Sequence, residues 1–192
     1  PVSFRCDDML AFQGAGCVFA SYIPTLTLSR GAFGAAADMI SWAQKHLDGA
    51  WGLEGRGDPL RRLANSEKSD QNRAVICGRA WKSMGSKIGG DFGDTDSCDE
   101  FPFAATYESG GSSVSSGAEC AQVVAVETGK AGQTEPERWN TVEPLGSHSA
   151  DAACVRGHTP LTENTDVGNA YRVFIGPQRL LDEDQFWVSV TA

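Results

Sequence analysis

The order of apolar and polar positions in the first half of the chain predicts short strands followed by a helix. Residues 17–28 are rich in β-branched and aromatic side chains and are interrupted by Pro24, which suits an edge strand or two short strands. Over residues 34–47 apolar side chains recur every three or four positions, and Gly49 is a suitable stop. The buried face of this helix should carry Ala36, Met39, Ile40, Ala43 and Leu47.

The same helical spacing occurs twice more. A helix is expected over residues 66–79, where Asn65 or Ser66 can cap the first turn. Another is expected over residues 164–175, with Val167, Tyr171 and Phe174 on its buried face. Asn164 stands at the predicted start of this third helix, which is an ordinary position for an N-cap.

Strands and polar connections alternate in the second half. Residues 122–126 form a short apolar run, residues 152–158 can return to the same sheet, and residues 185–190 alternate apolar and polar side chains. The low-complexity tract 109–117 and the polar stretch 127–151 are expected to be surface segments, the first of them mobile. Mixed helices and strands over 192 residues predict one α+β domain, residues 1–192, with a small antiparallel sheet.

Six cysteines favour disulfide bracing over a structural zinc site. They form no CxxC pair and no cysteine–histidine cluster with the spacing of zinc ligands. Their spacing suggests pairing in sequence order, although six cysteines allow 15 connectivities. The expected pairs are Cys6 with Cys17, Cys77 with Cys98, and Cys120 with Cys154. Disulfides persist in oxidising compartments, so we expect a secreted, extracellular protein. No apolar run reaches the roughly 20 residues that span a bilayer, which predicts no membrane association.

The net charge of −9 argues against binding nucleic acid by bulk electrostatics, but the charge is unevenly distributed. Residues 1–92 hold 11 basic and 9 acidic side chains, whereas residues 93–192 hold 5 basic and 16 acidic ones. Residues 56–87 alone hold eight basic side chains against three acidic ones. This basic segment can meet phosphates, or it can be an ordinary solvated surface.

A candidate for chemistry lies at residues 98–108, CDEFPFAATYE. This segment resembles the signature of the NucA/NucB family of small secreted deoxyribonucleases, in which Cys-Asp-Glu-aromatic-Pro is followed by Glu-Gly-Gly. The chain departs from that signature by placing Ser109 between Glu108 and Gly110. Residues 17–28, 156–168 and 179–182 resemble the amino-terminal and carboxy-terminal segments of longer members, so the resemblance covers nearly the whole chain.

The resemblance implies an active site like that of the ββα-metal nucleases. In that plan a base on one strand faces a metal held by a residue of the adjoining helix. Carried over to this sequence, Asp99 is the general base, because an ionised carboxylate can accept a proton from water. Glu100 is its neighbour and should point to the other face of an extended segment, where it can instead pair with an arginine. His158 is an alternative base or phosphate donor, or a histidine satisfied by a local hydrogen bond.

The remaining candidates would hold the metal or the substrate. Asn169 and Asn164 are the candidate metal ligands, with Glu163 as a charged alternative. The two asparagines are five residues apart and cannot share one helical face, so at most one is a direct ligand, and Asn169 is preferred. Arg156 can contact a phosphate through two hydrogen bonds. Oxygen ligands suit Mg, Mn or Ca.

The resulting hypothesis is a metal-dependent phosphodiester hydrolase that cuts DNA as a non-specific endonuclease. Contacts to backbone phosphates carry no sequence information, so base identity should matter little. We expect a monomer, and an accompanying inhibitor protein stays an open question. The alternative from another class is a secreted binding or interaction module that kept the fold and lost the chemistry. Serine hydrolase chemistry has little support because no GxSxG segment is present, and cysteine catalysis is disfavoured if all six cysteines are paired.

Overall fold

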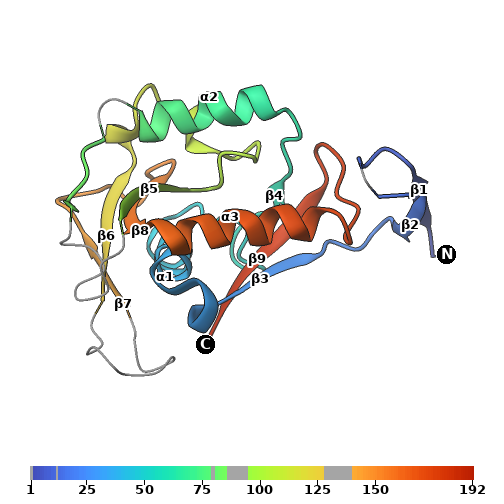
Figure 1. Cartoon of the computed structure of the whole chain (residues 1–192), viewed down its shortest axis with the longest axis horizontal. Helices are drawn as coiled ribbons and strands as arrows, with labels where there is room; N and C mark the ends of the chain where they lie inside the picture. Colours follow the sequence, from blue (N-terminus) through green and yellow to red (C-terminus); the bar gives the residue numbers. More distant parts are fainter. Residues whose placement is uncertain (1, 12, 79–80, 86–94, 128–139) are drawn as a thin grey trace.

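The computed structural model describes the chain except for residues 1, 12, 79–80, 86–94 and 128–139 (Figure 1). A four-stranded mixed sheet has the strand order β5-β8-β6-β7. Its strands are β5 (Asp96–Phe101), β6 (Ala121–Glu127), β7 (Asn140–Pro144) and β8 (Val155–Pro160). The β5–β8 and β6–β7 pairs are antiparallel, and the β6–β8 pair is parallel.

A three-stranded sheet and a separate hairpin complete the strands. In the sheet, β9 (Gln185–Thr191) lies between β3 (Thr25–Ser29), to which it is parallel, and β4 (Leu60–Arg61), to which it is antiparallel. The hairpin pairs β1 (Phe4–Asp7) with β2 (Gly16–Phe19) near the N-terminus. It is joined to the body by ion pairs from Arg5 to Asp184 and from Arg179 to Asp7, each at 2.5 Å.

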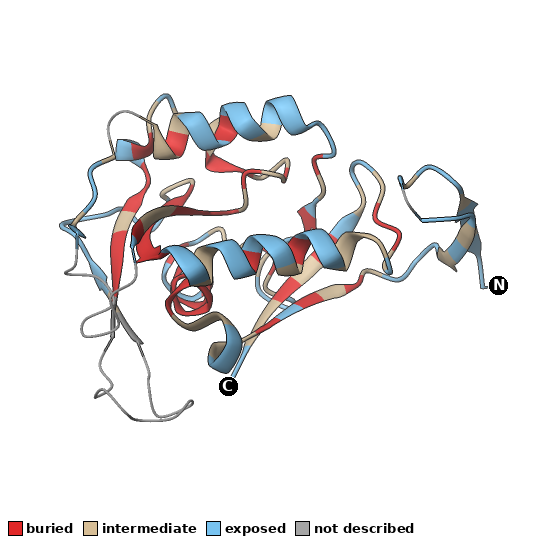
Figure 2. Cartoon of the chain, in the orientation of Figure 1, coloured by how far each residue is buried: buried red, intermediate tan, exposed pale blue. Residues whose placement is uncertain are grey.

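Helix α1 (Arg30–His46) forms the centre of the hydrophobic core. It contacts β3 and β9 of one sheet and β5, β6, β7 and β8 of the other. The predicted stripe of apolar residues is completely buried, and Figure 2 shows α1 as buried beyond its exposed first turn, while the outer faces of α2 and α3 are exposed. The helix begins four residues before the predicted start because a first turn precedes a kink at Gly34, where φ is +42°. That first turn has no apolar periodicity to reveal it.

Helices α2 (Ser66–Cys77) and α3 (Leu161–Ile175) lie nearer the surface. Asn65 caps α2 by accepting a hydrogen bond from the Lys68 amide. Of the two residues predicted as caps, Asn65 and Ser66, the structure therefore confirms Asn65. Residue 79, the predicted end of this helix, lies outside the described residues, as do residues 79–80 and 86–87 of the basic segment. Helix α3 begins three residues earlier than predicted, and its N-cap is Pro160. The prediction that Asn164 caps it was therefore wrong.

The three expected disulfides are present. Cys6–Cys17 closes the β1–β2 hairpin, Cys77–Cys98 joins the end of α2 to β5, and Cys120–Cys154 joins the start of β6 to the residue before β8. Sequential pairing arises because each bridge links neighbouring segments of the chain. The architecture is thus a disulfide-braced α+β fold. Among the described helices none is long and apolar enough to cross a membrane.

Two expected surface segments contain ordered structure. In the polar stretch 127–151, β7 pairs with β6, while residues 128–139 lie outside the described part. In the tract 109–117, Ser109 is fully buried. The short 3-10 helix η3 (Gly110–Ser112) lies within the tract, and a second one, η4 (Gly117–Glu119), begins at its last residue. A Cβ at Gly111 would overlap the backbone of Asn72, and one at Gly117 would overlap the backbone of Ile76. The tract is therefore not a fully exposed surface loop, because these glycines let it pack closely against α2.

This packing gives a test. Gly117→Ala places a methyl group against the Ile76 carbonyl of α2, so we expect a loss of about 1 to 3 kcal/mol in the free energy of unfolding. Gly14→Ala is the control, because a Cβ there meets nothing within 4 Å. Chemical denaturation of both variants measures the difference. Equal midpoints for the two variants would contradict close packing of the tract.

Candidate functional site

The strands β5 and β8 and the helix α3 form a ββα unit. The two strands are antiparallel, and α3 begins at Leu161, immediately after β8 ends at Pro160. In the register, Asp99 lies opposite Gly157 and Glu100 lies opposite Arg156. Because side chains alternate between the faces of a strand, Asp99 and Glu100 leave β5 on opposite sides. The Asp99 carboxylate therefore faces the side of the sheet covered by α1 and α3, and the Glu100 carboxylate faces α2.

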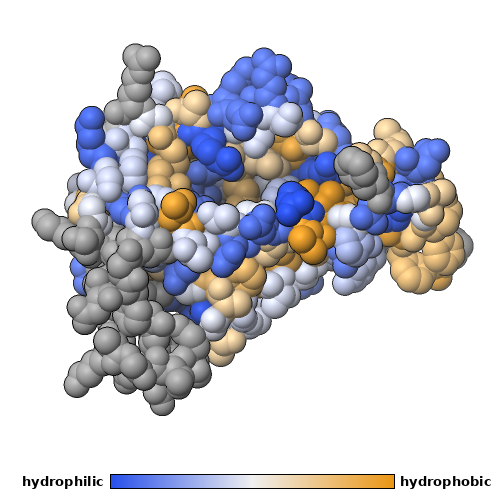
Figure 3. All heavy atoms as spheres, in the orientation of Figure 1, coloured by the Kyte–Doolittle hydropathy of each residue, from blue (hydrophilic) through white to orange (hydrophobic). Residues whose placement is uncertain are grey.

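A pocket of about 470 Å³ opens where β5 lies between α2 and α3. Figure 3 shows the molecule hollowed between these helices, with hydrophilic side chains gathered over α2. Polar groups from three elements converge here, with an apolar wall beside them. The polar lining includes Arg73, Ser97, Asp99, Glu100, Asn164 and Thr165, and the apolar wall includes Phe103, Ala104, Ala105, Leu161, Val167 and Tyr171.

Asp99 is the buried acceptor of this pocket. Its Oδ1 accepts a 2.8 Å hydrogen bond from the Glu100 amide, while its Oδ2 is buried and has no hydrogen-bond partner. Only 7% of the residue is exposed. Burial, together with the neighbouring Glu100 carboxylate, raises the pKa of Asp99 well above its ordinary value. An unsatisfied buried carboxylate oxygen is costly, so a group placed in the pocket would satisfy a strong acceptor.

Glu100 is held by α2. Its Oε1 accepts from the Arg73 guanidinium at 3.2 Å, and the Cys77 Sγ of the Cys77–Cys98 disulfide lies 3.3 Å from its Oε2. Burial raises the pKa of Glu100, and Arg73 opposes that rise. The pairing of Glu100 with an arginine is the structural role considered from the sequence. The guanidinium of Arg73 is itself largely exposed, which leaves it able to contact a ligand at the pocket.

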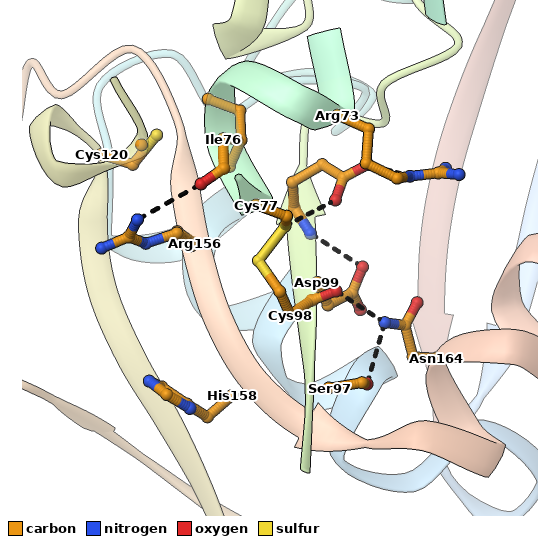
Figure 4. Close-up of a disulfide and its surroundings, with 12 residues drawn as sticks. Arg73, Ile76, Cys77, Ser97, Cys98, Asp99, Cys120, Arg156, His158 and Asn164 are labelled. Atoms are coloured by element: carbon orange, nitrogen blue, oxygen red, sulfur yellow. Dashed lines mark hydrogen bonds and ion pairs between the residues drawn. A yellow bond between two sulfur atoms is a disulfide. The ribbon is translucent and has the colours of Figure 1, made fainter. Parts of the chain in front are cut away.

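Asn164 is oriented toward Asp99 by two hydrogen bonds (Figure 4). Its Nδ2 donates to Ser97 Oγ at 3.0 Å and to the Cys98 carbonyl at 2.9 Å. An amide whose nitrogen is fixed in this way has its oxygen directed elsewhere, and in Figure 4 that oxygen points away from β5, below Arg73. Asn164 and Asp99 both line the pocket. The structure thus brings these two predicted residues together.

The other two helix candidates lie outside the pocket lining. The Oε2 of Glu163 accepts a 2.5 Å hydrogen bond from the Ala35 amide, just after the kink in α1. A Cβ at Gly34 would overlap that carboxylate, so Glu163 is packed against α1. Asn169 is exposed on α3 and does not line the pocket, because five residues rotate it well away from Asn164. The preference for Asn169 over Asn164 is thus not supported by their positions.

His158 and Arg156 lie on the α2 side of the sheet, away from the pocket lining. His158 Nδ1 is 3.0 Å from Asp96 Oδ2, and its ring lies 5.2 Å from that of Trp81. Arg156 is 9% exposed and donates to Gln122 Oε1 at 2.7 Å and to the Ile76 carbonyl at 3.3 Å. Both side chains are thus engaged in structural contacts. The arginine that lines the pocket is Arg73, whereas the one expected to contact a phosphate was Arg156.

Arg73 could have been found only in part from the sequence. It belongs to the basic segment that was expected to meet phosphates, and it lies in a predicted helix. Nothing in the linear order links it to Glu100, which is 27 residues away. The apolar wall from Phe103 and Tyr171 was likewise not predicted, because Tyr171 was assigned to the buried face of its helix and Phe103 was considered only as part of the signature segment.

The donor set suits a hard divalent cation. Among the described residues, no group of three or more His, Cys, Asp or Glu side chains is arranged to hold a metal. The pocket offers instead the orphaned Asp99 Oδ2 and the Asn164 carboxamide oxygen, whereas the Glu100 carboxylate is paired with Arg73 on the other face of the strand. Carboxylate and carboxamide oxygens are the ligands that Mg and Ca take, and Mg commonly keeps several waters. The residues present fit such an ion.

The burial of Asp99 gives a stability prediction. Its folded-state pKa is raised, so the folding penalty is absent below the unfolded pKa of about 3.9 and grows as pH rises toward the folded pKa. Asp99→Asn removes the charge and can keep the hydrogen bond from the Glu100 amide. We expect the variant to have a higher Tm than the wild type at neutral pH in EDTA, by about 2 to 4 °C for each kcal/mol relieved.

The gain should vanish at pH values below about 4, where Asp99 is protonated in both states. Asp166→Asn is the control, because Asp166 is exposed on α3. Thermal unfolding from pH 3.5 to 8 measures both variants. A Tm gain that is the same at every pH would show that relief of a buried charge is not its cause.

Comparison with known proteins gives one family match, which covers part of this site. The family model for the deoxyribonuclease NucA/NucB matches residues 53–134, a stretch that contains α2, β5 and the pocket residues from Arg73 to Ala105. No curated protein and no solved structure gives a significant match. The match confirms the resemblance first drawn from residues 98–108. Residues 53–134 of the chain therefore match the deoxyribonuclease NucA/NucB family.

Proposed function

We propose that the chain is a secreted endonuclease that hydrolyses DNA phosphodiester bonds with a divalent cation and with Asp99 as general base. The observation that carries the proposal is the Asp99 Oδ2 atom, a buried acceptor without a partner at a pocket that Arg73 and Asn164 also line. An orphaned carboxylate oxygen costs stability, and such costs are typical of groups kept for function. The match to a deoxyribonuclease family supports DNA as the substrate.

In the proposed reaction Asp99 accepts a proton from a water molecule, and the water oxygen attacks the phosphorus. The bond from phosphorus to the leaving sugar oxygen breaks, and that oxygen takes up a proton from solvent. Burial raises the pKa of Asp99, which makes its carboxylate a stronger base than an exposed aspartate. The Asp99 carboxylate is kept in place by the hydrogen bond from the Glu100 amide to Oδ1, so Oδ2, which has no partner, is the oxygen that would accept the proton.

Arg73 would neutralise the phosphate. Its guanidinium is paired at 3.2 Å with Glu100 on one side and is otherwise exposed at the pocket. A guanidinium can donate to two oxygens of one phosphate, which also directs the phosphorus toward Asp99. Contacts of this kind read the backbone and not the bases, which agrees with cleavage at any sequence.

Asn164 would be the helix ligand of the cation, and the Asp99 carboxylate would be the ligand from β5. The hydrogen bonds to Ser97 Oγ and the Cys98 carbonyl fix the Asn164 amide nitrogen, so its oxygen would be the atom that binds the cation. When bound, a divalent cation of the Mg, Mn or Ca type supplies charge neutralisation at the phosphate and at the leaving oxygen. The asparagine on α3 and the aspartate on β5 correspond to the ββα-metal plan, which we extend to this chain.

Secretion and the single-domain organisation are part of the same proposal. Three disulfides would be retained outside the cell, where thiols are oxidised. Ion pairs from Arg5 and Arg179 bind the N-terminal hairpin to the body of the fold, which supports one domain over residues 1–192.

The proposal is tested by cleavage of circular double-stranded DNA. The wild type should cut the circle with Mg, Mn or Ca and should stop in EDTA. Asp99→Asn should lower the rate by about 10² to 10⁴, the usual contribution of a general base. Asp166→Asn removes an exposed carboxylate of α3 and should leave the rate unchanged. If the wild type cuts no DNA with any of these ions, the nuclease proposal fails and a binding module on the same fold takes its place.

A second variant tests the phosphate contact. Arg73→Ala should lower kcat/KM for DNA about 10- to 100-fold, because a hydrogen bond to a charged group contributes about 1.5 to 3 kcal/mol. Arg73→Lys keeps the charge and should recover part of the loss. Arg172→Ala removes an exposed arginine of α3 outside the pocket and is the matched control. Similar losses for Arg172→Ala and Arg73→Ala would point to general electrostatic attraction in place of a specific contact.

A further inference from the structure

One face of α3 lines the pocket, and a glycine stands in the middle of it. The residues that α3 contributes recur every three or four positions, which places them along one side of the helix. They are Leu161, Asn164, Thr165, Val167, Gly168 and Tyr171. Gly168 is the eighth residue of the 15-residue helix, one turn beyond Asn164. Glycine is among the least favourable residues in a helix interior, so its presence at this position needs a physical reason.

Neither backbone conformation nor packing supplies that reason. The φ of Gly168 is not in the positive range that favours glycine. A Cβ built at Gly168 meets no atom within 4 Å outside its own helix turn. Other glycines of the fold differ clearly, since a Cβ at Gly157 would overlap Met39 and one at Gly111 would overlap Asn72. The fold of this chain would therefore accept a side chain at residue 168.

The space that a side chain would fill is the pocket itself. Gly168 lies on the α3 wall, and Arg73 lies on the α2 wall of the same pocket. The aromatic rings of Phe103 and Tyr171, stacked with their centroids 5.4 Å apart, belong to the apolar wall nearby. A ligand whose phosphate lies between Arg73 and Asp99 must continue out of the pocket. The bare backbone at Gly168 offers a path next to an apolar surface.

We propose that Gly168 is a clearance position, at which the sugar–phosphate backbone of a bound DNA strand crosses α3 beside the scissile phosphate. The inference rests on the proposed function and extends it, because it assigns the path of the polymer away from the reacting bond. A nucleotide has a charged phosphate and a less polar sugar, which match Arg73 and the apolar wall respectively. A small phosphodiester ends near the reacting phosphorus and has no need of the clearance.

The test compares Gly168→Leu with Gly168→Ala and with Val173→Leu. Val173 is 63% exposed on the same helix and does not line the pocket, so its leucine variant controls for the new side chain. Binding is measured by fluorescence anisotropy of a labelled DNA duplex in EDTA, each substitution being made in the Asp99→Asn background to prevent cleavage. Hydrolysis of bis(4-nitrophenyl) phosphate and thermal unfolding are measured for the same substitutions in the otherwise wild-type protein.

Gly168→Leu should raise the Kd for the duplex by about tenfold or more. Its hydrolysis of the small diester should stay within about twofold of the wild type, and Val173→Leu should change neither quantity. Gly168→Ala should raise the thermal midpoint, because alanine is the better helix former and a Cβ there meets no atom. A lower thermal midpoint in both Gly168 variants would show that glycine is needed for folding and would overturn the proposal.

An unchanged duplex Kd in Gly168→Leu would also overturn it, as would an equal loss of DNA binding and of small-diester hydrolysis. Failure of the proposed function gives a different result. In that case the wild type hydrolyses neither DNA nor the small diester, while the anisotropy measurement still decides whether a strand crosses Gly168.

Discussion

The antiparallel register between β5 and β8 is the constraint on which the rest of the site depends. It places Asp99 opposite Gly157, where a side chain would overlap Met39 of the central helix α1. Helix α1 can approach the sheet closely at that pair, and this approach buries the strand on which the carboxylate stands. A shift of one residue would exchange the faces of Asp99 and Glu100 and would turn the Asp99 carboxylate away from α3. The position of the site is therefore fixed by core packing.

Burial of two adjacent carboxylates has a cost that the surrounding structure offsets only in part. Arg73 compensates Glu100, whereas Asp99 receives one hydrogen bond from a backbone amide and keeps an unsatisfied oxygen. Helix α2, which carries Arg73, buries few of its own side chains, and the Cys77–Cys98 disulfide fastens its end to the strand that carries Asp99. The disulfide thus holds the guanidinium over the pocket where hydrophobic burial alone would hold it weakly.

The sequence predicted elements where local periodicity and burial agree. The stripe on α1, the cysteine pairs and the strands β6 and β9 followed from spacing alone. Contacts between distant segments could not be predicted in this way. Glu163 binds the Ala35 amide 128 residues away, and the tract 109–117 packs on α2 through glycines that read as flexible. Asp99 was found because the family signature marks it, whereas Arg73 was seen only as one charge among eight.

Helix α3 shows how one element can serve both the core and the pocket. Val167 and Tyr171 are buried, and Glu163 joins the helix to α1, so the helix is fixed along its inner side. The side that lines the pocket carries a carboxamide at Asn164 and, one turn later, no side chain at Gly168. A rigid helix can position a ligand atom precisely only if the neighbouring surface leaves room for the substrate. In our proposal Asn164 supplies the atom that binds the cation, and Gly168 leaves the room through which the DNA strand passes.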